Sequence, residues 1–130
     1  MMIDLDEFSM VLNQKSIKHD LQNIDDDIQQ IIFKLNDKEV NMFLCEETHI
    51  KMFISLNKCI KDMNVEKALE KINDINVTDN EITLALLGDN KIYITKSIPF
   101  IGEVDWEKIF SILQEIVDRS EKVVSNFIQL

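Results

Sequence analysis

The spacing of the apolar residues changes along this chain of 130 residues, and that change constrains the fold more than any other feature. Apolar residues alternate with other positions in residues 39–45 and again in 49–56, which is typical of β-strands. From Asp105 almost to the C-terminus they recur every three or four residues, which predicts a long amphipathic helix. The chain therefore has to combine sheet and helix.

Further segments complete the expected order. A short helix is predicted over residues 4–14, a strand over 28–35 and a second helix over 64–75. Residues 81–98 indicate a hairpin that turns at Gly88-Asp89-Asn90. We expect an α+β fold, an antiparallel β-sheet with flanking helices in the order α-β-β-β-α-β-β-α, formed by a single acidic domain of residues 1–130.

Acidic residues dominate the charge, with 24 Asp and Glu against 14 Lys and Arg and a net charge of −10. Such a chain repels phosphate backbones and anionic lipid, so we expect neither nucleic acid nor a membrane as a partner. About half of the net charge lies in residues 1–27. The charge favours solubility in general, and the cluster is also a candidate acidic face for a basic protein, formed by Asp4, Asp6, Glu7, Asp25, Asp26 and Asp27.

Residues that enzymes use are sparse. His19 and His49 are the two histidines, and neither lies in a motif with a nucleophile. Two glycines are too few for a phosphate loop or a dinucleotide fingerprint. Cys45 and Cys59 form no CxxC pair, so we expect reduced thiols rather than a zinc site. We predict no catalytic residue, no metal ion and no cofactor, and an acidic N-terminus without a long apolar run indicates a cytoplasmic protein.

The order of elements resembles that of the type III secretion chaperones and the related YbjN-like family. The likeness is clearest from Glu81 onward, where a strand ends in Ser97-Ile98-Pro99-Phe100 and a helix opens with Asp105-Trp106-Glu107. The resemblance to the chaperones implies a cytosolic homodimer that holds the N-terminal segment of a secreted effector in an extended form, without nucleotide hydrolysis. The second predicted helix is short for a chaperone dimer helix.

Candidate partner-binding residues follow from that resemblance. They map to Leu5, Phe8 and Leu12 of the first helix and to Phe43 and Phe53 of two strands. Ordinary core packing is the favoured interpretation for Phe8 and Leu12. Phe43 and Phe53 fall on the opposite parity from the regular apolar positions, so both faces of their strands carry large apolar groups, and one face is predicted to meet a partner or a second subunit.

Two other functions compete with a chaperone. An immunity or inhibitor protein would use the acidic cluster to block a basic toxin or nucleic-acid-binding enzyme, and its binding would weaken steeply with salt. A YbjN-like regulator shares the fold and acts through a signalling partner. An enzyme is the least favoured class, because no set of residues at suitable spacing supplies a nucleophile, a base and a charge stabiliser together.

Overall fold

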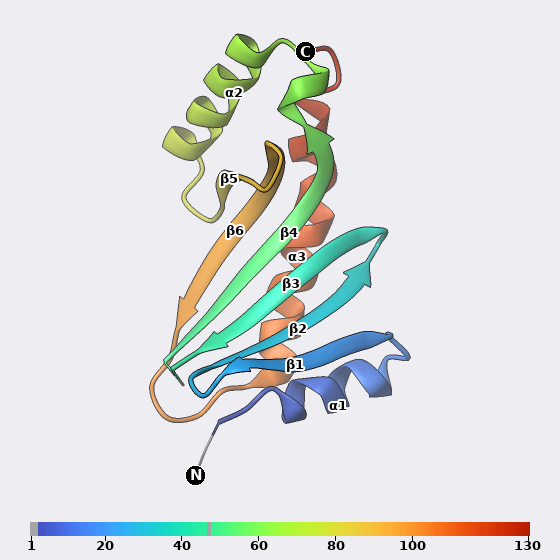
Figure 1. The fold of residues 1–130 in the computed structure, drawn as a ribbon, viewed down its shortest axis with the longest axis vertical. Coiled ribbons are helices and arrows are strands. Elements are labelled where there is room, and N and C mark those ends of the chain that lie inside the picture. The colour runs from blue at the N-terminus through green and yellow to red at the C-terminus, as the bar shows by residue number, and fades with distance from the viewer. Residues whose placement is uncertain (1–2, 47) are drawn as a thin grey trace.

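The computed structural model in Figure 1 describes residues 3–46 and 48–130, and its elements follow the predicted order with one additional strand. The elements are α1 (Asp6–Gln14), β1 (His19–Asp25), β2 (Ile28–Leu35), β3 (Lys38–Cys45), β4 (His49–Cys59), the 3₁₀ helix η1 (Ile60–Asp62), α2 (Val65–Thr78), β5 (Thr83–Leu87), β6 (Lys91–Pro99) and α3 (Trp106–Ser125).

The strands form a six-stranded sheet in the order β1-β2-β3-β4-β6-β5, and every neighbouring pair is antiparallel. Tight hairpins join most of them. Asn36 and Asp37 link β2 to β3 with φ of 51° and 64°, a left-handed conformation that Asn and Asp tolerate better than most residues. The α+β class and the antiparallel sheet with flanking helices are confirmed.

Strand β1 is the element that the apolar spacing does not predict. Its sequence, HDLQNID, is mostly polar and most of its side chains are exposed. It forms because β2 offers a partner edge, and side-chain amides cross-link the two strands. Gln22 Nε2 donates to Gln30 Oε1 at 2.7 Å, and Gln29 Nε2 donates to Asn23 Oδ1 at 3.1 Å. Tertiary pairing overrides weak β-propensity at this sheet edge.

One face of the sheet carries the core. Helix α3 lies behind the sheet in the view of Figure 1, and α1 lies beside β1 and contacts α3. The ring centroid of Phe8 on α1 lies 6.0 Å from that of Phe33 on β2 and 5.6 Å from that of Trp106 on α3. The buried apolar residues of all these elements form one cluster, so the helices cover a single side of the sheet.

Helix α2 borders the outer edge of β5. The side-chain amide of Asn76 donates to the carbonyl of Leu84 at 3.0 Å and accepts from its N–H at 2.7 Å. These two bonds imitate the pairing that a further strand would make. They close part of an edge that would otherwise be open to another chain.

A charged cluster ties the end of α2 to α3. Arg119 donates from Nη2 to Asp79 Oδ2 at 2.5 Å and from Nη1 to Glu81 Oε2 at 2.7 Å, and Asp79 also accepts the N–H groups of Glu81 and Ile82. Partial burial opposes ionisation of Asp79. The backbone donors and Arg119 outweigh that effect and hold the pKa of Asp79 below its usual range.

None of the helices formed by residues 3–46 and 48–130 is both long and apolar enough to cross a bilayer.

Candidate functional site

The sheet has a second face, and no helix formed by residues 3–46 and 48–130 covers it in Figure 1. Side chains alternate along each strand, so Val40, Met42 and Leu44 of β3 enter the core while the intervening residues point to the other side. The register carries this parity across the sheet, since Asn41 pairs with Phe53 and Phe53 with Thr95. We call this uncovered side, which includes Phe43 and Phe53, the open face.

An apolar hollow of about 450 Å³ lies on the open face. Among the residues that the structure describes, Lys51 is the single charged residue in its wall. The lining residues come from every strand of the sheet, and they are Ile24, Ile28, Asn41, Phe43, Cys45, Lys51, Phe53, Leu87 and Tyr93. Apolar contact area bounded by a few polar groups is the composition of a binding surface rather than of ordinary solvated surface.

Phe43 and Phe53 form the centre of this hollow. Their rings meet edge to face with centroids 5.7 Å apart and an interplanar angle of 87°. Both side chains are half-buried, although the strands around them are fully paired. The structure therefore places the two residues on the side that their parity indicates and brings them together. That they contact a partner stays a prediction.

The three candidates on α1 lie elsewhere. Leu5, Phe8 and Leu12 are all 0% exposed and belong to the core cluster. The backbone N–H of Leu5 also donates to Gln29 Oε1 at 2.7 Å, which fixes the start of the helix on β2. An amphipathic helix buries its apolar stripe first, and here the sheet and Trp106 cover that stripe. These three residues are core, so we do not retain them as a partner surface.

The predicted acidic face is partly assembled. Asp4, Asp25 and Asp26 line a hollow of about 480 Å³ between the start of α1 and the β1–β2 turn. Local bonds account for part of this arrangement, because Asp4 accepts the N–H of Asp6 at 3.0 Å and Asp25 accepts the N–H of Asp27 at 2.7 Å.

The remaining acids of that set sit close by. Asp6 and Glu7 occupy the first turn of α1, where negative charge complements the helix dipole. Within residues 3–46 and 48–130, no group of three or more His, Cys, Asp or Glu side chains is placed to hold a metal ion.

Sequence reasoning missed a contact between Ser9 and His19. Ser9 Oγ lies 2.5 Å from His19 Nε2, and His19 Nδ1 lies 2.9 Å from the carbonyl oxygen of Ile17. The carbonyl can only accept, so Nδ1 carries a proton, and in the neutral imidazole Nε2 then accepts from the serine hydroxyl. A hydroxyl beside an oriented imidazole is also the start of a nucleophilic site. The two residues are ten positions apart on different elements, and no local motif signals their contact.

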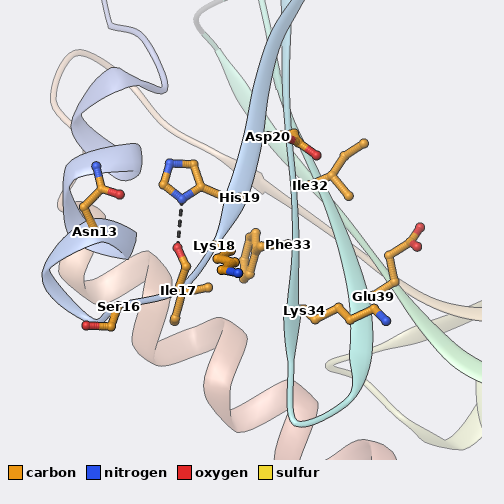
Figure 2. A pocket seen from close by; sticks show the side chains of 10 residues that line it. All are labelled: Asn13, Ser16, Ile17, Lys18, His19, Asp20, Ile32, Phe33, Lys34 and Glu39. Atoms are coloured by element: carbon orange, nitrogen blue, oxygen red, sulfur yellow. Dashed lines mark hydrogen bonds between the residues drawn. The ribbon is translucent and has the colours of Figure 1, made fainter.

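His19 also lines a hollow of about 980 Å³ at the edge of the sheet where α1 ends. Figure 2 shows its wall, in which Lys18, Asp20, Lys34 and Glu39 mix both charge signs. Ser9 is not among the residues of this wall. The pair joins α1 to β1.

Comparison with known proteins identifies a similar fold and no activity. No family model matches the chain. No curated protein matches it either. A solved structure, that of an uncharacterized protein from Methanothermobacter thermautotrophicus, is similar over 95% of this chain and 94% of its own, with 14% sequence identity and a TM-score of 0.65. At that identity the likeness concerns the fold alone.

Proposed function

We propose that this chain is a non-catalytic binding protein that holds a segment of another protein on its open face, as the resemblance to secretion chaperones implies. The observation that carries the proposal is the apolar hollow around Phe43 and Phe53, on a sheet whose other face is already packed by helices. Large aromatic groups at the centre of such a surface are the side chains that dominate binding energy in protein interfaces.

The exposure of apolar side chains around this hollow supports the binding of a partner there. Ile24 is 51% exposed and Leu87 39% exposed at its two ends, and the half-buried rings of Phe43 and Phe53 lie between them. Single exposed apolar residues are common on protein surfaces, but apolar side chains gathered in one hollow with few polar groups are typical of a binding site.

A capture experiment tests this function. The tagged chain is incubated with lysate of its source cells, in parallel with a Phe43→Ser/Phe53→Ser double variant and an Ile101→Ser control. Ile101 is fully exposed, lies in the link before α3 and is not a lining residue of the hollow. We expect the chain and the control to retain the same protein and the double variant to lose it, with all three showing folded thermal transitions. Equal retention by the double variant contradicts the proposal.

A second candidate is the acidic inhibitor. The observation that favours it is the shared hollow of Asp4, Asp25 and Asp26, which gathers charge from two segments far apart in the sequence. Replacing Asp4 and Asp26 with Asn is then expected to release the partner, and raising salt from 50 to 500 mM is expected to weaken binding strongly, on the order of tenfold or more. If the Phe43→Ser/Phe53→Ser variant releases the partner and high salt does not, the result favours the open face instead.

A further inference from the structure

We propose that the segment held on the open face is an amphipathic helix of the partner, with an acidic residue placed over Lys51. The inference rests on the proposed function and names the conformation and chemistry of what is bound. It differs from the extended segment that the resemblance implies, and the reason lies in the hydrogen bonding of the sheet.

An extended segment gains affinity by pairing its backbone with a free strand edge. Phe43 lies on β3 and Phe53 on β4, and each of these strands is paired on both sides. The strands under Phe43 and Phe53 therefore offer no free edge, and the outer edges of the sheet belong to β1 and β5, at the two ends of the hollow. A strand laid on this face would bury its own N–H and C=O groups without partners, whereas a helix satisfies them internally.

The hollow is shallow and extends across the sheet. Its wall reaches from Ile24 and Ile28 at one side of the sheet to Leu87 and Tyr93 at the other. Five interstrand spacings of about 4.8 Å separate the outer strands, a span of about 24 Å. At about 1.5 Å per residue, a helix of about 16 residues covers it. The covered face of the same sheet already accommodates the 20 residues of α3, so a second helix would complete a three-layer arrangement.

The charge of the open face selects the kind of helix. Lys51 stands opposite Phe43 in the register of β3 and β4, beside the aromatic pair. Lys34 and Lys91 lie on the open face together with Lys51, and Asp20 and Glu39 are the acidic residues beside them. This face is therefore less acidic than the chain as a whole, which has a net charge of −10. Among the described residues, Lys51 takes part in none of the four ion pairs. A carboxylate next to the apolar stripe of the partner helix fits the Lys51 ammonium.

Three labelled synthetic peptides of 16 residues test this inference by fluorescence anisotropy. The first has leucines at helical spacing flanked by Glu, the second replaces each Glu with Lys, and the third is the first with two central residues replaced by Pro. We expect the Glu peptide to bind about fivefold more tightly than the Lys peptide, as expected for one partly exposed ion pair. The Pro peptide is expected to bind at least tenfold more weakly than the Glu peptide, because Pro breaks the helix.

Variants of the chain assign the effect. Lys51→Glu is expected to abolish or reverse the preference for the Glu peptide, whereas Lys108→Glu, at an exposed position on α3, leaves it unchanged. If the Pro peptide binds as tightly as the Glu peptide, the bound segment is not a helix. A preference for the Lys peptide overturns the charge assignment. A dimer of the free chain that Phe53→Ser dissociates identifies a second copy as the occupant and overturns the inference as well.

The two proposals fail separately. If no peptide binds while Phe43→Ser/Phe53→Ser still releases the captured protein, the helix is wrong and the open face remains the binding surface. If that variant releases nothing, the proposed function itself fails.

Discussion

Phe43 and Phe53 meet edge to face on the open face of the sheet, with their ring centroids 5.7 Å apart. Their neighbours along the strands, Met42 and Met52, are fully buried on the other side. Adjacent residues of one strand thus point to opposite faces of the sheet, and substituting them one at a time measures how much each face contributes to stability.

Met52→Ala and Phe53→Ala are expected to separate core from open face. Met52 is 0% exposed, so its truncation leaves a cavity and is expected to lower the free energy of unfolding by about 3 kcal/mol. Phe53 is half-buried with solvent beside it, and its truncation is expected to cost about 1 kcal/mol, because solvent can fill the space. Urea denaturation checks both. A larger loss for Phe53→Ala than for Met52→Ala would place Phe53 in the core.

The edge of β5 gives a second prediction. Asn76→Ala removes both hydrogen bonds to Leu84 and is expected to cost about 1 to 2 kcal/mol of unfolding free energy. The amide of Leu84 is expected to exchange with deuterium faster, because its acceptor is lost. Asn73→Ala, an exposed position on the same helix, serves as the control. Unchanged exchange at Leu84 would show that Asn76 does not protect this edge.

The Asp79–Arg119 pair gives a pH dependence. The pKa of Asp79 is lowered from 3.8, so the unfolded state binds the proton more readily than the folded state. The contribution of Asp79 is therefore fully present above about pH 5 and is lost as the pH falls through its folded-state pKa. Asp79→Asn is expected to destabilise the protein by about 2 kcal/mol at pH 7 and much less at pH 2 to 3.

Acid unfolding curves of Asp79→Asn and of Asp74→Asn, an exposed acid on α2, check this assignment. The wild type and Asp74→Asn should lose stability together below pH 5, while Asp79→Asn shows a flatter profile. Parallel slopes for all three proteins would mean that Asp79 does not carry the dependence.

The contact of Ser9 with His19 predicts an effect on stability. Ser9→Ala leaves His19 Nε2 without its donor and is expected to lower the free energy of unfolding by about 1 kcal/mol. Ser111→Ala, at an exposed position of α3, is the matched control. Denaturant titration of the three proteins measures the difference. Equal stability of Ser9→Ala and the wild type would show that the hydroxyl does not hold α1 on β1.

The spacing of apolar residues predicted those helices and strands that bury one side in the core. The alternation in β3 and β4 and the three-to-four spacing of α3 arise because one side of each element meets the core. Strand β1 lay outside this rule, since an edge strand with polar side chains has no apolar period to read. Position on the sheet, and not local preference, makes it a strand.

The candidate site was predictable only in part. The unusual parity of Phe43 and Phe53 indicated a second apolar surface, because period two leaves no other place for them. Leu5, Phe8 and Leu12 carried the same apolar character, yet only the packing of α1 against Phe33 and Trp106 decides that they are core. The contribution of Ile24 and Leu87 to the hollow depends on the strand order, which no local pattern encodes.

Photo-crosslinking from the open face tests the central claim most directly. A benzoylphenylalanine is placed at position 53 in one variant and at position 115, an exposed site on α3, in another, and both are irradiated in the source cells. Binding on the open face predicts a discrete protein adduct from position 53, absent from position 115 and lost when Phe43→Ser is added. No adduct from position 53, or the same adduct from both positions, would contradict it.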